Sequence, residues 1–301
     1  MTEILTKERR ADVAPPTQTV TPRFRRRALL TRLPLRSQVA LVLVAFVALI
    51  VTAAPVLPIA DPFTGSLSDR LLPFFSDGYV LGTDSQGRDM LSRLVYGTRT
   101  SLIAGVVPIL IATSIGLVIG TIAGLAGKKV NTILMRAVDV LFAFPGVLLS
   151  LLLAITLGVG LGTLIIALSV VWIAPIARIA ETEVTRIRDL DFVTVARASG
   201  ATLPSILGRQ IVPVALPAVL AYATSLVGAN VAIAGGLGFI GLGVPSPEPE
   251  LGSILQEMQV AIYNNPGLAL APVILIVALS MLFPLVGDGF REAISGRGQD
   301  S

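Results

Sequence analysis

The sequence predicts an all-α membrane protein with six transmembrane helices. Its 301 residues are 53% hydrophobic and only 14% charged, a composition too apolar for a soluble domain of this length. Several charge-free segments reach the roughly 20 residues that a helix needs to cross a bilayer. The basic residues gather on one side of these segments, as the positive-inside rule requires.

One of the two longest charge-free runs, residues 140–177, accounts for two of the six spans. As a single helix its 38 residues would extend about 57 Å, nearly twice the thickness of a hydrocarbon core. We therefore expect two antiparallel helices joined by a turn at the glycine-rich segment Gly158–Gly162. The other charge-free runs predict the remaining four spans, which lie within 37–60, 100–127, Pro217–Gly241 and Leu268–Val286; the run 210–247 is equally long, but Pro213, Pro217 and its Gly/Pro-rich end leave one helix.

The distribution of basic residues predicts the orientation. With both termini in the cytoplasm, 19 of the 23 Lys and Arg residues lie inside. The predicted organisation is a basic cytoplasmic tail (1–36), a six-helix membrane domain (37–294) and a short cytoplasmic tail (295–301). Within the domain, residues 61–99 form an extracytoplasmic loop and residues 181–212 form a cytoplasmic loop.

The residue inventory excludes several kinds of chemistry. The chain has no cysteine and no histidine, which removes disulfides, thiol chemistry and imidazole metal ligands. The segment Gly124–Lys129 is only superficially like a phosphate-binding loop, because it lacks the G-x-x-x-x-G-K-[ST] spacing. We therefore expect no catalytic residue, no metal site and no bound cofactor in this chain.

Ion-coupled transport is also disfavoured, because the centres of the predicted spans carry no charge. Asp139 and Asp288 both fall near the inner ends of spans. Asn230 could still contribute a polar group within a span. A stand-alone ion-coupled carrier or channel therefore remains as an alternative of a different class.

An amphipathic helix is predicted in the extracytoplasmic loop, just before the second span. Its apolar face comprises Met90, Leu91, Leu94 and Val95, and its polar face comprises Ser92 and Arg93. Asp89 suits the positive N-terminus of such a helix. Two roles are open: a helix lying on the lipid surface, or a packing or gating element near the place where an external protein docks.

Two short helices separated by a glycine are predicted in the cytoplasmic loop. Asp189 or Asp191 can cap the first helix, and Gly200 suits the left-handed residue after its end. Thr202 can cap the second helix, with Pro204 tolerated in its first turn. One face of the first helix carries Phe192, Val195, Ala196 and Ser199. The loop is either a docking element for another protein or an amphipathic linker.

This loop resembles the signature called EAA in the permeases of ABC importers. The glycine of that signature lies thirteen residues before a proline, and Gly200 and Pro213 keep this spacing. The Glu-Ala-Ala of the family corresponds to Thr194-Val195-Ala196, so the leading glutamate is absent. By this resemblance the ATPase-coupling loop comprises Asp191, Phe192, Thr194, Val195, Ala196, Arg197, Ala198, Ser199, Gly200, Ala201, Thr202 and Pro213.

Further segments resemble the C-type permease subunits of dipeptide, oligopeptide and nickel importers. They are Leu81–Gly105, Met135–Pro145, Phe239–Pro245 and Gly287–Arg291. Two positions depart from that family, since Ala234 replaces a frequent Glu and Leu251 replaces a frequent Trp. The extracytoplasmic motif of the family corresponds to Gly82, Thr83, Asp84, Gly87, Arg88, Asp89, Ser92, Arg93, Tyr96 and Gly97.

The resemblance implies a type I ABC importer permease fold and one non-enzymatic subunit of a heteromeric importer. The implied partners are a homologous second permease, two ABC ATPase subunits and an extracytoplasmic substrate-binding protein, with the lipid bilayer around the spans and no nucleic acid. ATP and Mg²⁺ would be used by the ATPase subunits. The implied substrate is a di- or oligopeptide, with nickel or another small solute as the alternative within the family.

Overall fold

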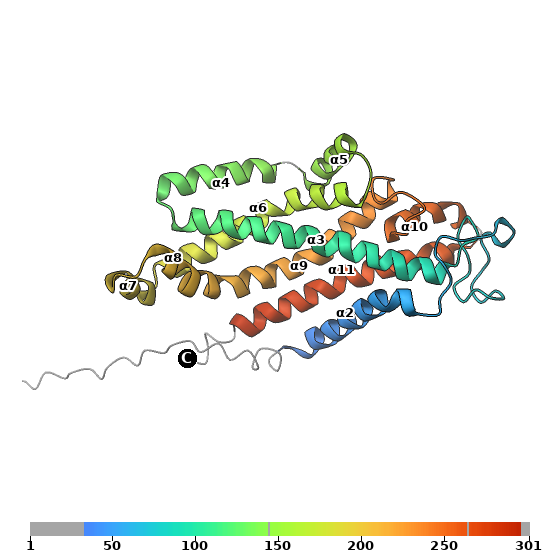
Figure 1. The fold of residues 1–301 in the computed structure, drawn as a ribbon, viewed down its shortest axis with the longest axis horizontal. Helices are drawn as coiled ribbons and strands as arrows, with labels where there is room; N and C mark the ends of the chain where they lie inside the picture. Colours follow the sequence, from blue (N-terminus) through green and yellow to red (C-terminus); the bar gives the residue numbers. More distant parts are fainter. Residues whose placement is uncertain (1–32, 144, 264, 296–301) are drawn as a thin grey trace, which may run out of the picture.

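The computed structural model describes residues 33–143, 145–263 and 265–295. In these ranges the regular secondary structure is helical, with isolated β-bridges in the loop before α3 (Met90–Leu125) (Figure 1). Five of the described helices are long and apolar enough to cross a membrane. They are α2 (Leu35–Ala53, extended by the 3₁₀ turn η1, Ala54–Val56), α3 (Met90–Leu125), α6 (Leu161–Arg188), α9 (Val212–Phe239) and α11 (Pro266–Ser295).

These five helices correspond to the first, second, fourth, fifth and sixth predicted spans, although α9 ends two residues before the predicted Gly241. The predicted tails fall almost entirely outside the described residues. The short elements gather at the two ends of the bundle (Figure 1). The α7 end carries α7 (Asp191–Ala198), α8 (Leu203–Ile206) and the π-helical turn η3 (Leu207–Ile211). The α10 end carries η2 (Leu67–Asp69), α10 (Leu251–Glu257) and η4 (Met258–Ala261).

The third predicted span is not one continuous helix. Its residues are divided between the end of α4 (Lys128–Ala143), a helix that begins well before the predicted span, and α5 (Gly146–Leu157); the two helices follow one another along the side of α6 (Figure 1). At 1.5 Å per residue, α5 alone extends only about 18 Å and is too short to cross a bilayer. Pro145 stands at the N-cap of α5, where its missing N–H costs nothing. The predicted hairpin turn is correct, because Gly158 and Gly160 take positive φ angles of 87° and 156° before α6 begins.

The predicted interfacial helix is wrong as a separate element. Met90 begins α3, which continues without a break to Leu125. The expected division into an apolar and a water-facing side also fails, because Met90, Ser92 and Arg93 are all fully buried. Segments near the α10 end cover both sides of this part of α3, so it packs inside the protein instead of lying on a lipid surface.

Glycines bring α3 close to α6. Gly116, Gly120 and Gly124 recur every four residues and therefore form one stripe along α3. A Cβ atom at Gly120 would lie only 2.7 Å from the backbone nitrogen of Glu181. The small-xxx-small spacing is typical of helices whose backbones approach closely in membranes.

Asn230 joins three helices at the centre of the bundle. Its side chain is fully buried in α9 and accepts a hydrogen bond of 2.7 Å from the indole N–H of Trp172 in α6. Its amide group donates to the carbonyl oxygens of Ala104 and Gly105 in α3, at 3.0 and 2.8 Å. A buried amide that makes all these bonds fixes the relative positions of α3, α6 and α9. Both of its N–H donors and its oxygen serve this helix packing.

We predict that Gly120→Val lowers the stability of the protein by about 1–3 kcal/mol, because the added side chain overpacks the α3–α6 contact. The measurement is the midpoint of thermal unfolding of the purified protein in detergent. Gly162→Val is the matched control, since a Cβ at this α6 position meets no atom within 4 Å. Equal midpoints for the two variants would show that the close approach of α3 and α6 does not depend on Gly120.

Candidate functional site

The end of α7 has the geometry expected for Gly200. This residue takes a left-handed φ of 79° directly after the C-cap Ser199. Its N–H donates to the Arg197 carbonyl at 3.0 Å, and the N–H of Ala201 donates to the Ala196 carbonyl at 3.1 Å. This pair of bonds is the Schellman motif, which satisfies the last carbonyls of a helix. The predicted left-handed position is therefore confirmed.

The predicted caps are only partly correct. The N-cap of α7 is Leu190, whose carbonyl accepts from the N–H groups of Val193 and Thr194, so neither Asp189 nor Asp191 caps the helix. Asp191 lies instead in the first turn, where its negative charge interacts favourably with the positive end of the helix dipole. Thr202 does occupy the N-cap of α8, but its hydroxyl makes no capping bond there.

The buried contact of α7 is made by Val193, which the sequence did not predict. Val193 is fully buried in a cluster with residues at the end of α6, in η3 and at the start of α9, among them Ile187, Ile211 and Ala215. The face predicted from the sequence points away from the bundle, with Phe192 43% exposed and Val195 62% exposed. Ala196 is half-buried between the two faces. Helix α7 is thus held by one side and leaves apolar side chains exposed on the other.

The remaining residues of the predicted coupling loop surround this exposed face. The hydroxyl of Thr194, which stands where the family has glutamate, donates only within α7, to the Leu190 carbonyl at 3.5 Å. The other exposed positions of the loop are Asp191, Arg197, Ala198, Ser199, Gly200 and Thr202. Ala201 is half-buried against the Val193 cluster, and Pro213 is exposed in the first turn of α9.

A buried network of four charges holds the α10 end together. The carboxylate of Asp84 pairs with Arg88 at 2.5 Å and with Arg93 at 3.1 Å. The carboxylate of Glu257, at the end of α10, pairs with Arg88 at 2.7 Å and with Arg93 at 2.8 Å. Both arginines are at most 2% exposed. The two negative and two positive groups neutralise one another, which makes their burial tolerable.

Other residues of the predicted extracytoplasmic motif shape the turn before α3. The Thr83 hydroxyl donates to the Asp69 carbonyl and accepts from the Leu72 N–H. Asp89 caps α3 by accepting from the Ser92 N–H at 2.8 Å, as the sequence predicted for the helix start. Gly82 and Gly87 take positive φ angles of 68° and 74° in this turn. Gly87 also leaves room for the Ser66 backbone.

The last two residues of the motif continue this packing along α3. Tyr96 is half-buried, and a Cβ on Gly97 would lie 2.7 Å from the Ile254 side chain of α10. Of the two roles left open, the structure therefore supports packing and not a lipid-surface helix. The motif joins the loop, α3 and α10 into one unit.

Sequence reasoning missed two acidic residues of this unit, Glu257 and Glu250. Glu250 is fully buried and caps α10, with its carboxylate accepting from the Gly252 N–H, the Ser253 N–H and the Ser101 hydroxyl. Burial raises the pKa of the Glu250 carboxyl, while these three donors act in the opposite direction. The sequence did hold a signal for this site. Residues 210–287 carry only three charges, and all three are acidic residues within 248–257.

The aspartates considered for ion coupling both have arginine partners. Asp139 pairs with Arg178, and Asp288 lies 3.9 Å from Arg291. In the described part of the chain no group of three or more acidic residues is placed to hold a metal ion.

These features define a class of protein: a helical membrane protein with one end closed by buried charges and a short, partly exposed apolar helix at the other. A family model described as "Binding-protein-dependent transport system inner membrane component" matches residues 116–297. The chain belongs to this family, and it is a permease subunit of an ABC importer.

Curated relatives support this assignment. The chain is 35% identical over 226 residues to a glutathione transport system permease protein of Pectobacterium atrosepticum, covering 75% of each chain. It is 32% identical over 261 residues to a dipeptide transport system permease protein of Haemophilus influenzae, covering 85% of this chain and 88% of the relative.

Among solved structures, the fold is similar to an inward-facing form of the MetNI methionine ABC transporter. The TM-score is 0.58 at 24% sequence identity, and the match covers 68% of this chain and 97% of that one. At this level of identity the likeness concerns the fold alone, and it confirms the fold class predicted from the sequence.

We predict that Glu257→Ala destabilises the protein by about 3–5 kcal/mol, because it leaves two buried arginines without one of their two carboxylate partners. Thermal unfolding of the purified protein measures the effect. Glu248→Ala, which removes an exposed acidic residue nine positions away, serves as the control. If both variants unfold at the wild-type temperature, the network does not contribute to the stability of the α10 end.

Proposed function

We propose that this chain forms half of the translocation pathway of an importer for di- or oligopeptides. In this proposal it pairs with a homologous second permease, two ATPase subunits and an external substrate-binding protein. The observation that carries the proposal is the exposed apolar face of α7, held at the end of a membrane bundle in a family of ABC importer permeases. The peptide substrate is supported by relatives that are named for dipeptide and glutathione transport.

The proposed role of α7 is to connect an ATPase to the membrane helices. Val193 belongs to one buried cluster with the end of α6 and the start of α9, so a force on α7 is passed through this cluster to both long helices. On the outer side, Phe192, Val195 and Leu203 offer an exposed apolar surface that a cleft in a partner can bury. Thr194 adds no charge to this surface, so docking relies on apolar contact and shape rather than on the glutamate of the family.

In the same proposal ATP and Mg²⁺ bind to the partner ATPases. This chain supplies no phosphate-binding loop, since Gly124–Lys129 lacks the required spacing. Binding of substrate and its release then depend on movements that the ATPases impose through α7.

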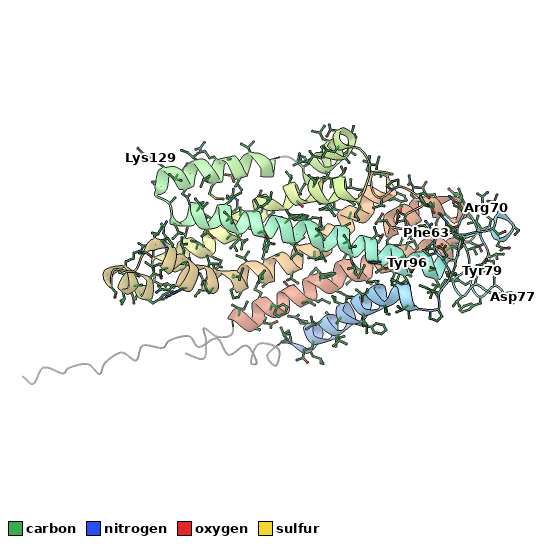
Figure 2. All side chains as sticks on the ribbon, in the orientation of Figure 1. Phe63, Arg70, Asp77, Tyr79, Tyr96 and Lys129 are labelled. Atoms are coloured by element: carbon green, nitrogen blue, oxygen red, sulfur yellow. The ribbon has the colours of Figure 1, made fainter. Side chains whose placement is uncertain are left out.

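The proposed orientation places the α7 end in the cytoplasm and the α10 end outside. The α7 end carries most of the basic residues of the described chain, including Lys128, Lys129 and Arg186, whereas the exposed loop at the α10 end contains Asp61, Asp69 and Asp77. Figure 2 shows Lys129 at one end of the bundle and Arg70, Asp77 and Tyr79 at the other. This distribution agrees with the positive-inside rule.

We predict that single cysteines at Ser66 and Ser199 react with an impermeant thiol reagent from opposite sides of the membrane. Both serines are exposed, and the chain has no cysteine of its own, so each signal comes from one site. In intact cells only Ser66→Cys should be labelled, and in inverted vesicles only Ser199→Cys. Labelling of both cysteines in intact cells would refute the proposed orientation.

We predict that Gly200→Val lets the chain insert into the membrane but greatly reduces ATP-driven peptide uptake by the reconstituted importer. A β-branched residue in a left-handed conformation costs roughly 1–2 kcal/mol, which distorts the end of α7 without touching a membrane helix. The measurements are co-purification of the ATPases and accumulation of a labelled dipeptide in vesicles.

Gly127→Val is the matched control, because Gly127 lies in another loop at the α7 end and a Cβ there meets no atom within 4 Å. Normal uptake by Gly200→Val would make the loop a linker only. Uptake of nickel but not of dipeptide by the wild-type importer would replace the peptide assignment while leaving the permease role intact.

A further inference from the structure

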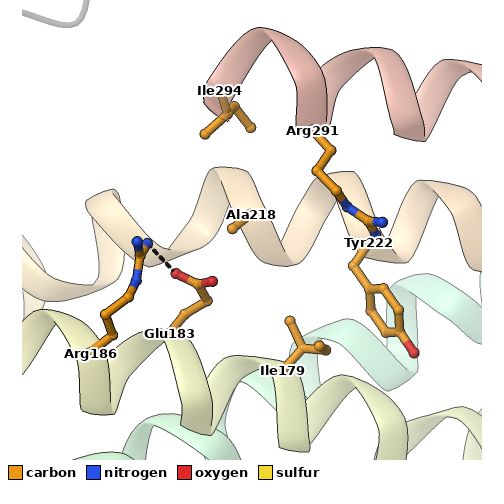
Figure 3. A pocket seen from close by; sticks show the side chains of 7 residues that line it. All are labelled: Ile179, Glu183, Arg186, Ala218, Tyr222, Arg291 and Ile294. Carbon is orange, nitrogen blue, oxygen red and sulfur yellow. Dashed lines mark hydrogen bonds and ion pairs between the residues drawn. The ribbon is translucent and has the colours of Figure 1, made fainter. Parts of the chain in front are cut away.

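A cavity of about 560 Å³ opens between α6, α9 and α11 near the α7 end (Figure 3). Its floor is formed by Ala218 and Tyr222 of α9. One wall carries Glu183 and Arg186 of α6, and the opposite wall carries Arg291 of α11. The volume lies in the range of sites that take small molecules. The cavity therefore combines an apolar floor with charges of both signs on facing helices.

The charged side chains of the cavity make no strong ion pair or hydrogen bond that a ligand could not replace. Arg186 donates to Glu183 at 2.6 Å, but the arginine side chain is 69% exposed, and exposed pairs of this kind contribute little stability. The guanidinium of Arg291 lies 5.9 Å from the centre of the Tyr222 ring and 3.9 Å from Asp288. Both of these contacts are longer than a hydrogen bond, so its N–H donors can engage a carboxylate.

The face of α9 that forms the floor continues toward the α10 end as small residues. Ala229 lies seven residues, or two turns, after Tyr222, and Ala232 and Gly236 follow at spacings of three and four residues, which places them on one face. All three are exposed, and Gly236 lines a second, apolar cavity of about 190 Å³. Helix α2, by contrast, exposes Leu, Val and Phe side chains of the kind that contact lipid. This face of α9 is therefore suited to a pathway between proteins rather than to acyl chains.

We propose that this cavity is a peptide-binding subsite at the α7 end of the pathway, which recognises the two charged ends of a short peptide. Arg291 binds the α-carboxylate, Glu183 binds the α-ammonium group by exchanging its bond to Arg186, and Tyr222 with Ala218 contacts the side chains. This inference rests on the proposed function, because it names the part of the permease that takes the substrate. A zwitterion can pair with groups of opposite sign on the two walls, whereas a purely anionic ligand such as a lipid phosphate would use the arginines and leave Glu183 without a new partner.

A cysteine at Ala218 tests the proposal in the complete importer reconstituted in nanodiscs, where both sides of the membrane are accessible. The chain has no other cysteine, so the labelling rate with a charged thiol reagent reports on this cavity alone once partner cysteines have been replaced. Dialanine should slow the labelling of Ala218→Cys, whereas dialanine that is acetylated and amidated at its ends should not. Adding Arg291→Gln should raise the dialanine concentration needed for half-protection by about tenfold or more, because a charge-assisted bond is lost.

Two further variants separate binding from structural effects. Glu183→Gln should abolish the preference for dialanine over N-acetyl-dialanine while keeping the preference for a free carboxylate. Arg178→Gln, on the same helix but outside the cavity, should leave protection unchanged. If the Arg291 variant fails to assemble, the Glu183 variant with the two peptides still decides the question.

The outcomes distinguish this inference from the proposed function. Equal protection by dialanine and its end-blocked form would overturn the recognition of charged ends. Labelling that slows in anionic-lipid nanodiscs, with no effect of dialanine, would make the cavity a lipid site. ATP-driven uptake of dialanine without protection of Ala218→Cys would overturn the proposed subsite but not the proposed function. Protection of Ala218→Cys without any uptake would support the subsite and contradict the proposed peptide transport.

Discussion

The contact between α3 and α6 is the constraint on which the other parts of the structure depend. Gly116, Gly120 and Gly124 bring the two backbones together, and this fixes where the last turns of α6 lie. Arg188, at the end of α6, donates to the Gly124 carbonyl at 2.6 Å and so secures that end of the pair. Helix α7 begins three residues after Arg188, so its position follows from the position of the end of α6. The place of the exposed α7 face is thus decided by glycines in the membrane.

The opposite end of the bundle is held by charge instead of by close backbones. Pairing Arg88 and Arg93 with Asp84 and Glu257 adds little net stability compared with apolar packing, because four charges lose their water. A shift of the loop, α3 or α10 relative to the others would leave buried charges unpaired, so the network favours the register seen here. The two ends therefore differ: the α10 end is closed by a specific buried network, and the α7 end keeps an open cavity and exposed apolar side chains.

The membrane spans were predictable because an uncharged segment of bilayer length has few alternatives to a helix. Gly200 was predictable for a similar reason, since its left-handed conformation is local to the chain. The start of α3 was not, because Arg93 looks like a water-facing residue until Glu257, 164 residues away, is placed beside it. Helix α4 was also missed, because it begins at Lys128 and carries charges, whereas the predicted spans are charge-free segments. Val193 was missed because its burial depends on partners from α6 and α9.

Helix α6 links the two proposed sites of this permease. Glu183 faces the cavity only five residues before Arg188, where α6 ends, and Val193 of α7 packs back onto that same end. Arg291 belongs to α11, which packs on α9 and carries no part of the α7 loop. A displacement of α7 would therefore move Glu183 with α6 more directly than it moves Arg291. If the proposed function is correct, the ATPases change the distance between Glu183 on α6 and Arg291 on α11. A peptide held at both ends is then released when this distance no longer matches the length of the peptide.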